Sequence, residues 1–229
     1  MISIIIPTYN EEQHIAKLVE YLRLYNNDLI CEIIVVDAGS SDNTMKAATG
    51  AGAKAVVSPV KGRASQMNYG ASIANGDIFY FVHADSFPPA TFILDINQSI
   101  KNGFDFGRYR TKFDSKKWIL KVNAFFTRFD FFICYGGDQT LFIKKKLFNT
   151  IGGFSPGMKI MEDYEIVTRA KAIAKYKVIQ KDTLVSARKY DTNSWLKVQL
   201  ANKKIVQMYK KGASQQEMVD MYKKLLTYR

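Results

Sequence analysis

The stretch "CEIIVVDAGSSDNT", residues 31–44, decides the fold of this chain. Its first half is rich in Ile and Val, which is typical of a buried strand, and the Gly, Ser, Asp and Asn residues that follow are typical of a turn that opens a helix. The same order recurs on both sides, with strands predicted at 1–6, 53–58 and 77–82 and helices at 11–25 and 63–74. Strands that alternate with helices of this length indicate parallel β-α-β units, so we predict an α/β fold with helices on both faces of a mostly parallel central sheet.

Polar segments follow the predicted strands, at 7–10, 37–40, 58–63 and 83–85. Because the carboxyl ends of parallel strands meet at one edge of a sheet, we expect these segments to converge on the rim where such sheets bind ligands. Asp37 has two interpretations: it organises a turn before an N-capped helix, or it accepts a hydrogen bond from a ribose hydroxyl or a base N–H. No GxGxxG pattern accompanies it, which counts against a dinucleotide site.

The chain has 229 residues and a formal net charge of +12. That charge favours an acidic partner such as nucleotide phosphates, anionic lipid or nucleic acid, without choosing among them. We predict a single domain over 1–229, because no linker, repeat or low-complexity segment interrupts the sequence. Cys31 and Cys134 lie far apart and lack zinc-type spacing, so no disulfide framework or structural metal is expected and a reduced cytoplasmic setting is favoured.

His83 and Asp85 end the strand predicted at 77–82. One interpretation is a satisfied histidine beside a turn-forming aspartate. The other is a metal site, because side chains at i and i+2 of an extended segment point to the same side and could contact one divalent ion that bridges a diphosphate. The position at a strand end favours the metal, and an imidazole beside a carboxylate suits Mn²⁺ somewhat better than Mg²⁺.

Two pairs of charged residues lie at predicted helix starts. Lys61 and Arg63 either are solvated or, together with helix N–H groups, hold a diphosphate. Glu162 and Asp163 suit the helix macrodipole without any function, or one serves as a general base while the other orients what is deprotonated. Arg188, near the end of the last predicted strand, could reach an anion.

The most membrane-like stretch is 118–135, which is interrupted by charges and too short to span a bilayer, although it could lie against one. The basic tail, 191–229, is predicted to form two helices that are split at Gly212. An apolar stripe at helical spacing begins at Trp195. Packing of this stripe on the sheet is favoured, and peripheral contact of the tail with the inner face of a membrane is the alternative.

Six segments, taken together, resemble the family 2 glycosyltransferases of GT-A fold. Within that family the nearest resemblance is to the bacterial subfamily labelled arsenosugar-biosynthesis glycosyltransferase. The segments stand in the expected order and at sensible spacing: "IIIPTYNEE" (4–12), "VVDAGSSDNT" (35–44), "KGRASQMNYG" (61–70), "HADSFPP" (83–89), "GGDQTLFIKKKLFNTIGGF" (136–154) and "MEDYEI" (161–166).

The resemblance implies an inverting, hexosyltransferase-type transfer from a nucleoside diphosphate sugar, with UDP as the favoured nucleotide, to an unknown acceptor hydroxyl. It divides the chain into a nucleotide-binding half at 1–90 and an acceptor and catalytic half at 91–190. It places the nucleotide at Pro7, Thr8, Tyr9, Glu11, Asp37, Ser40, Lys61, Arg63, Gln66 and Ala84. It places the donor sugar and acceptor at Gly136, Gly137, Asp138, Gln139 and Arg188.

The resemblance also makes Asp163 the base with Glu162 as its neighbour, and it makes Asp85 and His83 the ligands of a divalent cation, Mn²⁺ or Mg²⁺. Ser86 stands where many relatives carry another acid, which removes a negative charge from the metal motif. Two alternatives remain open. One is a nucleotidyltransferase, although the acidic "PTYNEE" replaces the basic Gly-rich loop of such enzymes; the other is a basic module that binds membrane or nucleic-acid surfaces. Nucleic acid is not an expected partner of the transferase.

Overall fold

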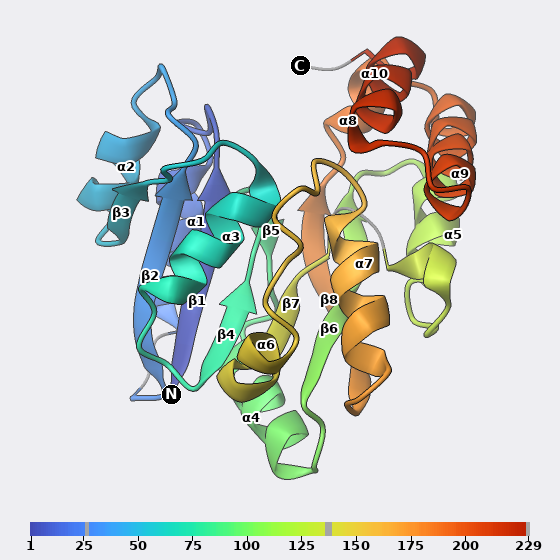
Figure 1. The fold of residues 1–229 in the computed structure, drawn as a ribbon. Coiled ribbons are helices and arrows are strands. Elements are labelled where there is room, and N and C mark those ends of the chain that lie inside the picture. Colours follow the sequence, from blue (N-terminus) through green and yellow to red (C-terminus); the bar gives the residue numbers. More distant parts are fainter. Residues whose placement is uncertain (26–27, 136–138, 228–229) are drawn as a thin grey trace.

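The computed structural model describes residues 1–25, 28–135 and 139–227. Within them the strands form one sheet in the order β3-β2-β1-β4-β7-β6-β8-β5 (Figure 1). The strands are β1 (Ile2–Thr8), β2 (Ile30–Asp37), β3 (Lys54–Val57), β4 (Ile78–Phe81), β5 (Ser86–Phe87), β6 (Phe106–Asp114), β7 (Leu141–Lys144) and β8 (Tyr176–Ser186). The helices are α1 (Ile15–Leu24), α2 (Thr44–Gly50), α3 (Arg63–Ser72), α4 (Phe92–Lys101), α5 (Trp118–Phe126), η1 (Phe132–Cys134), α6 (Lys145–Thr150), α7 (Glu162–Lys171), α8 (Lys189–Thr192), α9 (Trp195–Lys210) and α10 (Gln215–Leu225).

The N-terminal half is the parallel part of the sheet. β1 pairs in parallel with β2 and β4, and β2 pairs in parallel with β3. All of β1 is buried, as expected for a strand that is covered on both faces. Helix α1 begins at Ile15, later than the predicted 11, because the backbone N–H groups of Asn10 and Glu11 donate to the side chains of Ser40 and Thr44 in the neighbouring loop.

The second half of the chain adds an antiparallel strand, β7, to the sheet. β7 runs antiparallel to both β4 and β6, while β8 is parallel to β6. The short β5 leaves the end of β4 and pairs with β8 on the far side of the sheet. This crossing carries residues 83–87 from the N-terminal half to the end of β8. The expected α/β fold with a mostly parallel central sheet is confirmed, with antiparallel pairs confined to β5 and β7.

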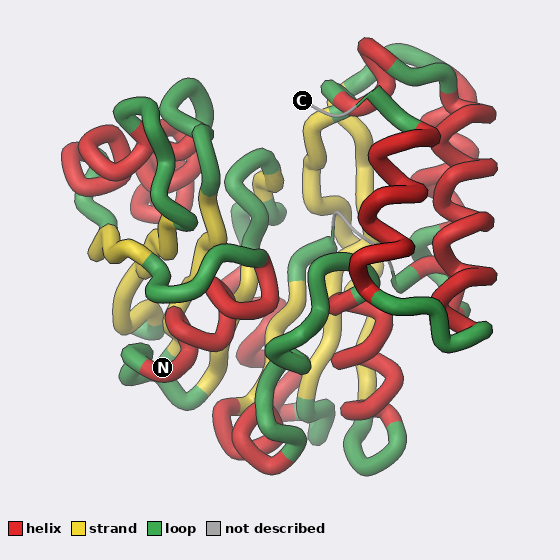
Figure 2. The backbone as a smooth tube through the Cα atoms, turned by 45° about the horizontal axis from the view of Figure 1, so that its top comes forward, coloured by secondary structure: helices red, strands yellow, loops and turns green. Residues whose placement is uncertain are grey.

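Three apolar clusters hold the layers together. One lies under α1, α2 and α4, and a second lies on the opposite sheet face under α3, α6 and α7. The third joins α5 to α9 and α10, which run side by side along one edge of the molecule (Figure 2). Val198, Ala201 and Ile205 of the predicted apolar stripe are buried in this third cluster, so the stripe packs within the protein, but mainly against helices rather than on the sheet as expected. None of the described helices is long and apolar enough to cross a bilayer.

Candidate functional site

The turn after β2 is built around the carboxylate of Asp37. This side chain is 1% exposed and accepts hydrogen bonds from the backbone N–H groups of Gly39 (2.8 Å) and Ser40 (2.7 Å) and from the Ser40 hydroxyl. Gly39 has φ +80°, a conformation that glycine adopts without a steric penalty. The Lys61 side chain lies over this glycine, within 4 Å of where a β-carbon would stand. Asp37 therefore organises the turn, and its direct contact with a nucleotide stays a prediction.

Gln66 on α3 links the carboxyl ends of β1 and β2. This buried side chain donates from its amide nitrogen to the carbonyl oxygens of Thr8 (2.8 Å) and Val36 (2.7 Å). Both amide hydrogens are thus used within the protein, which corrects the expectation that Gln66 faces a ribose or diphosphate. Pro7 and Thr8 are also buried, whereas Tyr9 is 55% exposed at the rim.

Arg188 joins three strand ends. Its guanidinium donates to Glu11 Oε2 after β1 (2.9 Å) and lies 3.2 Å from Asp85 Oδ2 after β4. The sequence placed Arg188 at the donor sugar or acceptor, but these contacts place it among the predicted nucleotide and metal residues. The crossing of β5 explains the meeting, because it carries Asp85 to the end of β8.

The segment around His83 and Asp85 is a tight turn. The backbone N–H of Ser86 donates to the carbonyl of His83 (3.0 Å), so the extended geometry assumed for a shared pair of ligands is wrong. Ala84 is buried in the core, so contacts with a ligand there would come from the backbone. Among the described residues no group of three or more His, Cys, Asp or Glu side chains is placed to hold a metal. The chemistry still fits a divalent ion, because Mg²⁺ is commonly held by one or two carboxylates together with phosphates and water.

The N-termini of α3 and α7 meet through an ion pair. Arg63 Nε, on the first residue of α3, lies 3.1 Å from Glu162 Oε1, and the Glu162 side chain is only 4% exposed. Met161, which precedes α7, has φ 68°, an unusual value for a residue with a side chain. Such strain often marks functional sites, and here it lies directly before the first turn of α7, which carries Asp163.

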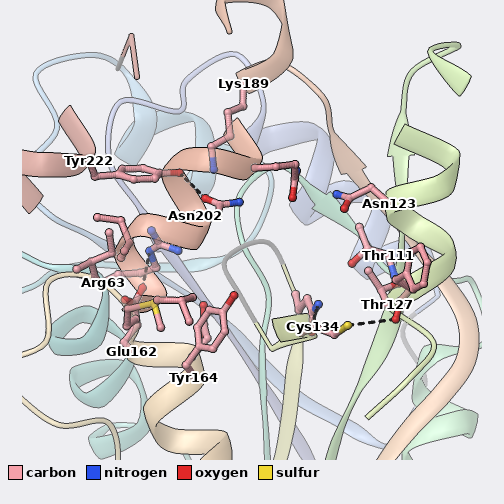
Figure 3. A pocket seen from close by; sticks show the side chains of 18 of the residues that line it. Arg63, Thr111, Asn123, Thr127, Cys134, Glu162, Tyr164, Lys189, Asn202 and Tyr222 are labelled. Carbon is pink, nitrogen blue, oxygen red and sulfur yellow. Dashed lines mark hydrogen bonds and ion pairs between the residues drawn. The ribbon is translucent and has the colours of Figure 1, made fainter. Parts of the chain in front are cut away.

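Asp163 is one of the residues that line a cleft of about 700 Å³. Figure 3 shows Thr111, Asn123 and Thr127 on the opposite wall from Arg63 and Glu162. Lys189, Asn202 and Tyr222 form the roof, and they come from α8, α9 and α10 (Figure 3).

Two buried polar atoms, on side chains that line the cleft, have no hydrogen-bond partner among the described residues. They are Oε1 of Gln139, whose amide nitrogen donates to the Cys134 carbonyl, and Nε2 of Gln199 on α9. Gln139 is thus brought to the site, while Gly136, Gly137 and Asp138 lie outside the described residues. Burial raises the pKa of the Cys134 thiol at the cleft wall, so this side chain is a neutral thiol rather than a nucleophilic thiolate.

Sequence reasoning missed several residues that line the cleft. Asn123, Gln199, Asn202 and Tyr222 were assigned to an aromatic segment or to a helical tail, and Lys189 was assigned to the last predicted strand. The polar residues on the inward side of α9 carried a weak signal. Gln199 and Asn202 each directly follow a buried residue of the apolar stripe, Val198 and Ala201.

The site therefore combines basic side chains at the strand ends, Lys61, Arg63 and Arg188, with the carboxylate of Asp163, which lines a cleft. Cations that can stabilise a departing phosphate and a carboxylate that can accept a proton are the two groups needed for a hydroxyl to displace a phosphate.

Comparison with known proteins decides the family. The model of "Glycosyl transferase family 2" matches residues 3–163, which is more than half of the chain. The chain belongs to glycosyl transferase family 2. Its curated relatives include the dolichol-phosphate mannosyltransferase of Pyrococcus furiosus, 35% identical over 109 residues, 45% of this chain and 31% of that protein. Glucosyl-3-phosphoglycerate synthase of Mycolicibacterium smegmatis is 33% identical over 96 residues, 38% of this chain and 32% of that protein. The match thus spans about a third of each relative.

Solved structures of glycosyltransferases share the fold of this family 2 member. The mannosyltransferase PcManGT of Pyrobaculum calidifontis, in complex with GDP-Man and Mn²⁺, superposes with a TM-score of 0.67 at 16% identity, over 89% of this chain and 61% of that one. Glucosyl-3-phosphoglycerate synthase of Mycobacterium tuberculosis, with Mn²⁺, UDP and its product, gives 0.64 at 19% identity over 93% and 80%. S. aureus TarS 1-349 with UDP-GlcNAc gives 0.66 at 20% identity over 82% and 58%. The GT-A fold class is confirmed.

Proposed function

We propose that this family 2 protein is an inverting glycosyltransferase that moves a sugar from a UDP-sugar to an acceptor hydroxyl. The observation that carries the proposal is the Arg63–Glu162 ion pair, which joins the strand-end rim to the helix that bears Asp163, one of the residues that line the cleft. A donor bound along the strand-end rim would have its anomeric carbon between the rim and Asp163.

The rim residues have separate tasks in this proposal. The nucleoside lies against Tyr9 and the turn that Asp37 and Ser40 organise, and the diphosphate lies near Lys61 and Arg63. UDP in the structures of TarS and of the synthase, which share this fold, supports the choice of nucleotide, and the GDP-Man of PcManGT makes GDP the competitor.

Asp85 and His83 would hold the divalent ion, Mn²⁺ or Mg²⁺, which supplies charge neutralisation to the departing diphosphate when bound. Arg188 already compensates Asp85 and Glu11, with a 2.9 Å hydrogen bond to Glu11 and a 3.2 Å ion pair to Asp85. One guanidinium between two carboxylates leaves a net negative charge, which suits a cation. The Mn²⁺ and Mg²⁺ in related structures support this assignment.

Asp163 is the general base. It accepts the proton of the acceptor hydroxyl as the oxygen attacks the anomeric carbon from the side opposite the diphosphate, which inverts the configuration there. Glu162 is a positioning residue, because its carboxylate pairs with Arg63. The free Oε1 of Gln139 and the polar groups of Asn202 and Lys189 are suited to orient the acceptor. The reducing cytoplasm is our proposed setting, since Cys31 and Cys134 are both free thiols.

Release of nucleoside diphosphate from purified UDP-glucose, UDP-N-acetylglucosamine and GDP-mannose tests the proposal, with water as the default acceptor. We expect release from one UDP-sugar, and Asp163→Asn abolishes it while UDP binding is kept. Asp220→Asn on the exposed side of α10 is the matched control and keeps the wild-type rate. Surviving turnover together with weakened UDP binding in Asp163→Asn would overturn the assignment of the base.

A further inference from the structure

Helix α5 carries its large apolar side chains on the outside. Trp118 is 71% exposed, Phe126 51%, Phe125 47% and Val122 41%, while Leu120 is the helix's one buried residue among those described. Trp118, Val122 and Phe125 follow the i, i+4, i+7 spacing of one helix face. A surface helix of a globular protein ordinarily turns this face to the core.

The exposed face continues beyond the helix as a cluster of rings. Phe129 packs on Phe125 with ring centroids 5.9 Å apart and on Phe131 at 5.6 Å, and Phe131 is 58% exposed. We name these residues the aromatic surface: Trp118, Val122, Phe125, Phe126, Phe129 and Phe131. Contiguous exposed apolar surface of this kind marks an interaction site.

Cations frame the aromatic surface. Arg128 lies 4.0 Å from the centre of the Phe125 ring, and its Nε is buried with no partner among the described residues. A shallow groove of about 220 Å³ beside Phe125 is lined by four basic side chains and one acid, Arg110, Lys112, Lys121, Arg128 and Asp182. Asp182 pairs with Arg110 in this groove, which leaves net positive charge.

Helix α9, which packs with α5 in the same apolar cluster, also exposes apolar and basic side chains. The helix exposes Leu196 (59%) and Leu200 (58%), and four further exposed positions are lysines, Lys197, Lys203, Lys204 and Lys210. Asp130, one of the few acids near the aromatic surface, is paired with Lys171 at 2.6 Å.

We propose that the aromatic surface docks onto an anionic lipid bilayer. The rings would enter the boundary between headgroups and acyl chains, where Trp and other aromatic residues are favoured, and the basic groove would hold a lipid phosphate. The charge argues against a second copy of this chain as the occupant, because a two-fold contact would set the same cations against each other. The surface differs from the tail that was expected on sequence, since it is formed by α5 and the residues after it, and the apolar stripe of the tail is buried.

The surface also borders the cleft, because Phe126 and Phe131 belong to both. Docking would therefore hold the mouth of the cleft against the bilayer. The inference rests on the surface alone and does not depend on the proposed transferase activity.

Co-sedimentation of the full chain with lipid vesicles tests the proposal. The probes are vesicles of phosphatidylcholine alone and of phosphatidylcholine with phosphatidylglycerol in equal parts. We expect binding to the anionic vesicles, weakened by salt, and little binding to the neutral ones. The double variant Phe125→Ser, Phe129→Ser should weaken binding by at least about tenfold, since two interfacial rings are lost.

The control is Leu94→Ser, Ile173→Ser, which removes two apolar side chains from elsewhere on the surface that are more exposed (60% and 62%) than Phe125 and Phe129 (47% and 37%). It should bind as the wild type does. Lys121→Glu, Arg128→Glu should lose the preference for anionic vesicles, and this variant keeps the test decisive if the ring variant unfolds. Three results would overturn the proposal: no binding of the wild type to anionic vesicles, equal losses in variant and control, or a dimer in size-exclusion chromatography that the ring variant disperses.

Discussion

The strand-end rim and the cleft differ in how their amide and carboxylate groups are satisfied. In the rim, Asp37, Gln66 and Glu11 already have partners within the protein, whereas the buried Ser86 Oγ has none among the described residues. In the cleft, Gln139 Oε1 and Gln199 Nε2 are buried without partners among the described residues. Buried polar groups are ordinarily satisfied, so an exception asks for an explanation.

The contrast indicates two kinds of binding site. The rim is preorganised, because internal hydrogen bonds hold its loops in place before a ligand arrives. The cleft wall instead carries two amide groups that lack partners among the described residues, so it is less satisfied internally. Asp163 stands at the border of the two regions.

The largest effect is expected at that border. Asp163→Asn should lower the rate of transfer by about two to four orders of magnitude, which is the usual contribution of a general base, while UDP affinity stays within about twofold. Steady-state rates and calorimetry on the same preparation measure both. A parallel fall in rate and UDP affinity would show that Asp163 also supports nucleotide binding, which would contradict its assignment as the general base alone.

Gln66→Leu tests whether the rim is held by its own hydrogen bonds. The change removes two buried hydrogen bonds to strand carbonyls and should reduce the free energy of unfolding by about 1–3 kcal/mol. Urea denaturation followed by circular dichroism measures the loss. An unchanged midpoint would show that the strand ends need no support from α3.

Asp85→Ala separates the metal from the rest of the rim. In the presence of Mn²⁺ the variant should bind UDP at least about tenfold more weakly, a loss of about 1.4 kcal/mol. Without metal we expect no loss, because Arg188 is released from Asp85 and can approach the diphosphate. Asp77→Ala, an 86% exposed aspartate just before the same strand, is the control for titration in both conditions. Equal UDP affinity of Asp85→Ala and the wild type in Mn²⁺ would remove Asp85 from the metal site.

Gln199→Leu should have the smallest effect on stability. Its buried amide nitrogen has no partner to lose among the described residues, so the free energy of unfolding should change by less than about 0.5 kcal/mol. The same urea experiment, run beside Gln66→Leu, gives the comparison. A loss of unfolding free energy as large as that of Gln66→Leu would show that the Gln199 amide makes hydrogen bonds within the protein, as Gln66 does.

The rim was predictable from sequence because its chemistry is local. Each polar segment directly follows a strand, so the parallel order alone brings Asp37, Lys61 and Asp85 to one edge. The Glu162–Asp163 pair was found for a similar reason, since it begins a helix. The contacts were not predictable from sequence, because Gln66 supports strands and Arg188 bridges two carboxylates. The roles of the rim residues stay predictions.

The cleft was not predictable in the same way. Its walls come from β6, α5, α8, α9 and α10, and their meeting depends on the third apolar cluster rather than on any short pattern. The crossing of β5 had no sequence signal either, because a two-residue strand carries no periodicity. That crossing decides where Asp85 and Arg188 meet.

Calorimetric titration of the purified chain with UDP and with GDP, each with and without Mn²⁺, is the most direct test of a nucleoside diphosphate site at the strand-end rim. We expect saturable binding of UDP at one site per chain, strengthened by Mn²⁺, and weaker binding of GDP. Absence of binding by either nucleotide in both conditions would contradict the assignment of the strand-end rim as a nucleoside diphosphate site.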